Sequence, residues 1–228
     1  MQRIQPPNAS WTPGTPIPSP VGEMVSIDAA GLDLVATYKL MAGGILPRPI
    51  AFVSTVNADG SCNLAPFSYF NAVSSIPPTI MFAVTYKSNG DKKDTLINIE
   101  RSGEFVVNTV SEWMAQPMNH CSAEYPYGVS ELEKVGLTPI PSDTVAPPRV
   151  QESPIHLECK LFQAIPVGLP GPGASTVVIG EIVKFHIHKA AYQDGKVLVE
   201  ELKPLARLGG LAYGTIGDIF DLPRPKTA

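Results

Sequence analysis

The sequence predicts a mainly β protein, specifically a closed antiparallel barrel with a few capping helices. Short apolar stretches rich in β-branched and aromatic residues recur along the chain, and residues typical of turns separate them. Only a few stretches show the spacing of a helix. Closing the sheet into a barrel would also remove the exposed edges that so many strands would otherwise present.

The first two predicted strands form a hairpin. Residues 50–56 are short, apolar and β-branched, and residues 57–60 follow as a turn in which Gly60 tolerates a positive φ. Residues 61–71 return as a second strand that mixes polar and aromatic side chains. Because Pro66 cannot donate a hydrogen bond to a neighbouring strand, this strand must be an edge or contain a bulge.

The later elements follow from the same patterns. Residues 93–102 predict a helix with Asp94 as its N-terminal cap and Gly103 at its end, and residues 112–121 predict a second helix interrupted by Pro117. Residues 122–153 form a long surface excursion. The remaining strands are predicted at 79–84, 104–110, 155–167 and 176–188, with a short last piece at 197–200; residues 32–41 are a helical or irregular lead-in.

The chain divides into two zones. Residues 1–23 contain six prolines and few apolar residues, so they form an extended arm that cannot build its own core. This arm is either a disordered tail or an arm that wraps a partner subunit through Ile4, Trp11 and Ile17. Residues 24–228 are long enough for a single domain with a sizeable core.

Composition excludes several classes of protein. The 17 Lys and Arg residues against 21 Asp and Glu give a net charge of −4, which offers no electrostatic basis for binding nucleic acid or an anionic membrane. No apolar stretch approaches the roughly 20 residues of a membrane helix, and the N-terminus lacks a signal pattern, so we expect a cytoplasmic protein. The three cysteines are far apart, and His186 and His188 lack further ligands, so we expect no metal site.

The most specific stretch is residues 47–71, PRPIAFVSTVNADGSCNLAPFSYFN. Together with the motifs KDT at 93–95, FVVN at 105–108, RLGG at 207–210 and Tyr213, it resembles the flavin reductase-like family of FMN-binding split-barrel proteins. The likeness runs in the family's order from about Tyr38 to Tyr213. It implies a Greek-key split β-barrel over residues 24–228 that binds FMN and pairs as a homodimer, with the aromatic residues around the flavin at the subunit boundary.

The resemblance also implies the cofactor-binding residues. Arg48, Lys93 and Thr95 would bind the FMN phosphate together with the helix start at Asp94, although Arg48 and Lys93 are equally explained as solvated surface charges. Ser54, Thr55 and the strand up to Asn71 would face the flavin ring, with Arg207 and Tyr213 close to it. On that strand the expected contacts are Asn63, Ala65, Pro66, Phe67, Ser68 and Asn71. Phe67 has core packing as its alternative, and Arg207 and Tyr213 have local packing as theirs.

Two functions remain open on this basis. The first is an enzyme, a flavin reductase in which hydride passes from NADH or NADPH to FMN, with the reduced flavin then supplied to a monooxygenase or another electron acceptor. No catalytic acid or base is expected, because the cofactors carry the chemistry and the protein orients them. The alternative is an FMN-binding electron-transfer protein without its own nicotinamide site.

Overall fold

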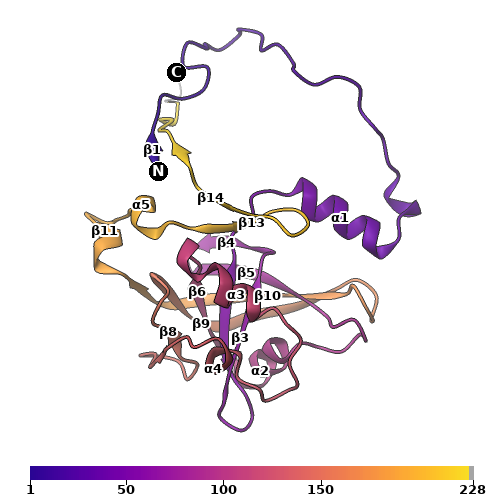
Figure 1. Ribbon diagram of the computed structural model, residues 1–228, viewed down its shortest axis with the longest axis vertical. Helices are drawn as coiled ribbons and strands as arrows, with labels where there is room; N and C mark the ends of the chain where they lie inside the picture. Colours follow the sequence, from indigo (N-terminus) through magenta and orange to yellow (C-terminus); the bar gives the residue numbers. More distant parts are fainter. Residues whose placement is uncertain (226–228) are drawn as a thin grey trace.

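The computed structural model describes residues 1–225 and is built around one seven-stranded antiparallel sheet (Figure 1). The strands lie in the order β3-β2-β6-β9-β10-β5-β4, and each neighbouring pair is antiparallel. Their bounds are β2 Ala51–Val56, β3 Cys62–Phe67, β4 Phe70–Ser75, β5 Pro78–Thr85, β6 Glu104–Thr109, β9 Ile155–Val167 and β10 Ser175–Ile187.

The other elements are short and lie around this sheet. The α-helices are α1 Leu34–Gly44, α2 Asp94–Ser102, α3 Ala115–His120, α4 Glu131–Lys134 and α5 Val199–Leu202, and the 3-10 segments are η1 Ala29–Gly31, η2 Glu112–Met114 and η3 Lys189–Ala191. The remaining strands form pairs: β1 Gln2–Arg3 with β15 Asp218–Ile219, β7 Pro139–Ile140 with β8 Arg149–Val150, β11 Tyr192–Gln193 with β12 Lys196–Val197, and β13 Leu205–Arg207 with β14 Tyr213–Thr215.

The sheet curls but does not close. Its edge strands β3 and β4 are consecutive in the chain, and Phe67 of β3 packs 5.2 Å, centroid to centroid, from Phe82 of β5. Within residues 1–225 no ladder of backbone hydrogen bonds joins β3 to β4, so the predicted closed barrel is wrong in this respect. On β3, Pro66 has no amide to donate, and the Leu64 amide donates to the Glu131 carboxylate instead. We call the opening between β3 and β4 the seam.

Two apolar cores hold the sheet. The concave face gathers side chains from six strands around Phe82 and Phe105, with Leu96 and Ile99 of α2 packed into the same core. On the other face, Phe52 and Leu64 pack against α3, α4 and β13. The alternation of β2, with Val53 in the first core and Phe52 in the second, explains why the first half of this strand, Ala51–Val53, is apolar on both faces.

Most predicted strands are confirmed, and the departures are local. The predicted strand 61–71 breaks at residues 68–69 into β3 and β4, although Pro66 does lie on an edge strand as expected. The last predicted piece, 197–200, is the end of β12 followed by the start of α5. The lead-in at 32–41 is helix α1, which ends at Gly44.

Two details of the predicted helices are wrong. Lys93, not Asp94, is the N-cap of α2, because Asp94 is already helical and its carboxylate pairs with the Lys87 ammonium at 2.9 Å. Pro117 does not interrupt α3. It lies in the first turn, where a missing amide costs nothing, and the change from 3-10 to α geometry comes earlier, at Ala115. Gly103 does end α2, with a φ of 70°.

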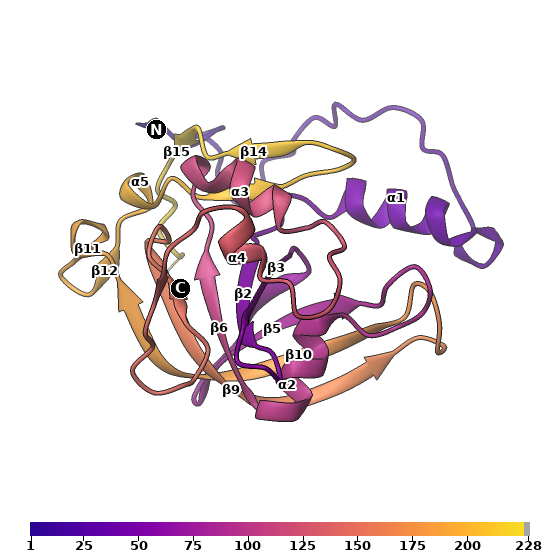
Figure 2. The same ribbon diagram turned by 60° about the horizontal axis from the view of Figure 1, so that its bottom comes forward.

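The N-terminal segment lies apart from the sheet. It begins with β1, which pairs in parallel with β15, and then runs as an arc to α1 (Figures 1 and 2). The extended character predicted for residues 1–23 agrees with this course, while the boundary at residue 24 stays a prediction. None of the helices in residues 1–225 combines the length and the apolar composition that a membrane crossing requires.

Candidate functional site

Three neighbouring cavities follow the seam. The first, the α2 pocket, lies beside the start of α2. The second, the Tyr213 pocket, shares Pro66 and Ser122 with the α2 pocket, and the third, the Arg48 pocket, shares Ser68 with the second. The shared residues show that the three cavities form one row along β3 and the link to β4.

The α2 pocket brings together most of the predicted phosphate-binding residues. It is lined by Asn63, Ala65, Pro66, Lys93, Asp94 and Thr95, all predicted, and also by Lys87, Cys121, Ser122, Ala123, Glu124, Tyr125 and Glu131. Lys93 caps α2 without a side-chain hydrogen bond, and the amides of Leu96 and Ile97 return to the Lys93 carbonyl. The amides of Asp94 and Thr95 therefore have no partner in the helix and make the helix start a donor surface.

Thr95 is held in place by a buried polar network. The Asn63 amide nitrogen donates to the Oγ1 atoms of both Thr55 and Thr95 at 3.0 Å, and Asn98 donates to the same Thr55 oxygen at 3.0 Å. Because the Thr95 hydroxyl accepts from Asn63, its own proton is free to donate into the pocket. Thr55 belongs to this network, one residue further from the pocket than Thr95, and positions Asn63.

The charges of the α2 pocket are unevenly compensated. Lys87 and Asp94 neutralise each other. Burial lowers the pKa of Lys93, an effect that the nearby Glu124 opposes and the like charge of Lys87 reinforces. Burial raises the pKa of Glu131, against the hydrogen bond from the Leu64 amide. Lys93, half-buried at the start of α2, is thus the basic residue of this pocket that makes no side-chain ion pair among the described residues.

The Tyr213 pocket is walled by the turn between β13 and β14. The Tyr213 hydroxyl donates to Asn119 Oδ1 at 2.9 Å, and the Arg207 guanidinium lies 4.5 Å from the centre of the Tyr213 ring. Arg207 also donates to the carbonyls of Gly210 and Ala212, which fixes the turn. Both predicted residues therefore line the seam, together with Ile50, Pro66, Ser68, Met118, Asn119 and Ser122.

Arg48 occupies a different place from Lys93. Its guanidinium is buried and donates to the carbonyls of Ala42, Ile45 and Leu208, and its Nε donates to Ser68 Oγ. These bonds clamp the end of α1 and the turn after β13 onto the link between β3 and β4. Arg48 lines the Arg48 pocket with the predicted residues Ser68 and Asn71, one cavity removed from the α2 pocket.

Three predicted contacts face away from the three cavities. Ser54 donates to the Pro148 carbonyl at 2.5 Å on the other face of β2, and Thr55 lies in the network behind Thr95. Phe67 is buried in the core against Phe82. Sequence reasoning missed the opposite wall, at 118–125 and Glu131. Residues 118–121 were predicted only as the end of a helix, and residues 122–131 only as part of a surface excursion, and neither stretch carries a binding motif.

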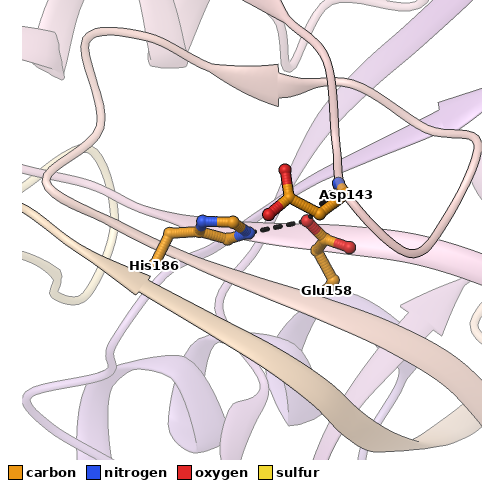
Figure 3. Close-up of side chains that lie close together, drawn as sticks. All are labelled: Asp143, Glu158 and His186. Carbon is orange, nitrogen blue, oxygen red and sulfur yellow. Dashed lines mark hydrogen bonds and ion pairs between the residues drawn. The ribbon is translucent and has the colours of Figure 1, made fainter.

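A second polar cluster forms where the loop at 141–148 meets β9 and β10 and where Asp143, Glu158 and His186 converge (Figure 3). His186 Nε2 lies 2.6 Å from Glu158 Oε1, and the Asp143 carboxylate pairs with the Lys184 ammonium at 2.5 Å. The Glu158 carboxylate, fully buried, also accepts the amides of Asp143 and Thr144. The charges and hydrogen bonds of this cluster are matched within it, so it anchors the 141–150 loop to the sheet.

The cysteines are free thiols in surroundings that favour their protonated form. All three are free, and burial raises the pKa of Cys62 and of Cys121 to about 12. Thiols with such values stay protonated at neutral pH and are poor nucleophiles.

Comparison with known proteins assigns the family. A family model described as "Flavin reductase like domain" matches residues 42–205, a span that includes β2 to α5 and every lining residue of the α2 pocket. The chain belongs to the flavin reductase-like family. An uncharacterized protein of Halalkalibacterium halodurans is 42% identical over 82% of this chain and 90% of its own length.

Solved structures of the family agree in fold. Nitrilotriacetate monooxygenase component B from Bacillus cereus is 40% identical, with a TM-score of 0.85 over 89% of this chain and 100% of its own. The 2-nitrobenzoate 2-nitroreductase of Pseudomonas fluorescens is 35% identical, with a TM-score of 0.80 over 90% of this chain and 98% of its own. A Shewanella frigidimarina protein described as having a split barrel domain, 23% identical, shares the fold with a TM-score of 0.73 over 86% of this chain and 96% of its own. The family supports a flavin as ligand and an oxidoreductase activity.

Proposed function

We propose that this flavin reductase-like protein binds FMN along the seam, with the phosphate in the α2 pocket, and reduces it with NADH or NADPH. One observation carries the proposal. Lys93, the free amides at the start of α2 and the Thr95 hydroxyl converge at one end of a row of three cavities. A long ligand with an anionic end and a flat polar ring matches such a row.

The charges and hydrogen-bond donors of the α2 pocket suit a phosphate. The helix dipole and the unpaired amides of Asp94 and Thr95 favour an anion at this point, and the Thr95 hydroxyl adds a third donor. The half-buried ammonium of Lys93 gains a partner when a phosphate binds, which offsets the cost of its desolvation. The Asp94 carboxylate does not repel the phosphate strongly, because Lys87 already neutralises it.

The walls of the Tyr213 pocket and the Arg48 pocket suit the flavin ring. Past Pro66 the row offers the polar side chains of Ser68 and Asn71 and the Arg207–Tyr213 wall. Bound FMN would supply the two-electron acceptor for hydride, which this chain's own side chains do not offer. The protein holds the ring and orients a nicotinamide over it, and hydride transfer needs no protein acid or base.

The acceptor of the reduced flavin is proposed from the relatives. One structural relative is the component B of a monooxygenase, so a separate monooxygenase is our preferred acceptor. We also propose that the protein is a homodimer, because Tyr69 and Phe70 remain only half-buried beside the seam. A second chain at this edge would shield a bound ring from water.

Flavin titration with matched lysine variants tests the site. Lys93→Ala removes a charge-assisted hydrogen bond, which is worth about 1.5–3 kcal/mol, so FMN binding should weaken by about 10- to 150-fold. Thr95→Val removes one hydrogen bond to the same charged phosphate and should weaken FMN binding by about 10-fold or more. Lys92→Ala is the control, since Lys92 is exposed and pairs with Glu100. Riboflavin, which lacks the phosphate, should bind all four proteins alike.

Quenching of flavin fluorescence measures these affinities. Equal FMN affinity of wild type and Lys93→Ala would place the phosphate elsewhere. Mixing the FMN-loaded protein with NADH and with NADPH then tests the activity through bleaching of the flavin absorption. Bleaching by dithionite but by neither nicotinamide would contradict the reductase and favour the electron-transfer protein.

A further inference from the structure

Residues 5–28 form an arm that lies almost free of the rest of the described chain, residues 1–225. Every residue of this stretch is exposed except Pro6, which is half-buried. Among residues 1–225, its hydrogen bonds join only positions within the stretch and the turn that follows at Ala30 and Gly31. In Figures 1 and 2 it arches away from the sheet between β1 and α1.

Both ends of the arm are nevertheless held. At the first end β1 pairs with β15, and the Arg3 guanidinium forms ion pairs with Glu200 and Asp221, both at 2.9 Å. At the other end Asp33 caps α1, and the Leu34 side chain lies against Gly173 of the β9–β10 hairpin. The arm is therefore a strap fixed at two points, and not a free tail.

The strap and α1 have the composition of an interface and not of a solvated surface. Glu23, Asp28, Asp33 and Lys39 are the only charged residues in 4–47, whereas 17% of the whole chain is charged. The exposed apolar residues of the strap include Trp11, Ile17, Val21, Met24, Val25 and Ile27, with Met24 79% and Val25 86% exposed. Depletion of charge around large apolar side chains is typical of interface cores.

The apolar surface continues from the strap to the flavin site. Leu34, Val35, Tyr38, Leu40, Met41 and Ile45 of α1 and the residue after it are also exposed. Met41 and Ile45 line the Arg48 pocket, which opens beside Ser68 and Asn71. Whatever covers the strap thus also covers one end of the seam.

A second copy of this chain fits this surface better than a transient partner. Surfaces that meet and separate are as polar as the rest of a protein, whereas permanent homodimer interfaces are more apolar. A strap of six prolines within residues 1–23 is already extended, so it loses little conformational entropy when a partner covers it. Two copies related by a two-fold axis can each pass the strap over the other.

We propose that residues 5–28 embrace a second copy of this chain, and that the strap and the exposed face of α1 together form the dimer interface beside the flavin site. The inference rests on the homodimer included in the proposed function. Each strap covers the partner's surface next to the Arg48 pocket.

Substitution of a strap residue in the full chain tests the embrace. Val25→Asp places a charge at an 86% exposed position, so the fold should be unchanged by circular dichroism. We expect its dimer dissociation constant to rise at least tenfold in analytical ultracentrifugation. Ile97→Asp is the control, because Ile97 is 38% exposed on α2 at the opposite end of the molecule from the strap (Figure 1).

Trp11 provides a second readout. With Trp113→Phe as the background, the only tryptophan left is Trp11, which should be shielded from acrylamide in the dimer and become quenchable on dilution to monomer. A monomeric wild type at micromolar concentration would refute both the homodimer and the embrace. A dimer that Val25→Asp leaves intact, with Trp11 fully quenchable, would refute the embrace alone.

Discussion

Replacing Glu158 by glutamine should cost the protein about 3 kcal/mol of folding free energy at pH 7. The carboxylate is fully buried, and each of its oxygens accepts two hydrogen bonds: Oε1 from the Asp143 amide and His186, and Oε2 from the amide and hydroxyl of Thr144. A glutamine amide group, in either orientation, sets an NH2 against one of the two backbone amides. A buried unsatisfied donor alone costs about 1–3 kcal/mol.

The lowered pKa of Glu158 leads to a similar value for the free energy that this carboxylate contributes to folding. Burial would raise this pKa, but the hydrogen bonds from Asp143, Thr144 and His186 outweigh it and lower the pKa to about 2, from the usual 4.5. A difference of about 2.5 pKa units corresponds to about 3 kcal/mol. Because the folded-state pKa is the lower one, this stability is complete above pH 4.5 and is lost as the pH falls toward 2.

Urea unfolding at pH 7 and pH 3.5 measures both effects. At pH 3.5 an unfolded glutamate is mostly protonated while Glu158 is still ionised, so the gap between wild type and Glu158→Gln should shrink by about 1 kcal/mol. Glu100→Gln, which removes an exposed ion pair with Lys92, should change stability by less than about 1 kcal/mol. A gap below 0.5 kcal/mol at pH 7, on the order of a surface change, would refute the assigned role of the cluster.

Three further outcomes are expected. Gly180→Ala would press a methyl group into the Phe105 ring, and overpacking of this kind should lower the free energy of unfolding in urea by about 1–3 kcal/mol. Arg48→Lys cannot reach all four acceptors of the guanidinium, so its melting temperature should fall by several degrees in calorimetry. Cys62 and Cys121 should resist iodoacetamide at pH 8 in the native protein and react fully in urea, as counted by mass spectrometry.

The strands were predictable because their signals are local. Residues 155–167 alternate and end at a proline- and glycine-rich turn. Pro66 by itself restricted its strand to an edge or a bulge, and the strand lies at an edge. The break after Phe67 was not predictable, since Ser68 and Tyr69 are compatible with a strand. It arises from the curl of the sheet, which places β3 and β4 at opposite edges of the hydrogen-bonded order.

The positions of the candidate site residues also divide into those that a local pattern predicts and those that depend on distant parts of the chain. Lys93 and Thr95 were predictable because a motif places them at a helix start, where the chemistry follows from the backbone. The clamp made by Arg48 depends on Leu208, which is 160 positions away, and no local pattern links the two. The Asn63 hydrogen bond to Thr95 likewise appears only once β3 lies beside α2.

The link between the two edge strands limits how the seam can open. Two residues, Ser68 and Tyr69, join β3 to β4, so the three Cα steps from Phe67 to Phe70 span at most about 11 Å. The seam therefore behaves as a hinge closed at this end, with its width near Ser68 fixed by covalent geometry. Opening must grow with distance from the link and be greatest near Asn63 and Lys93. We expect a ligand to enter and leave through the α2 end, with the ring end acting as a rigid stop.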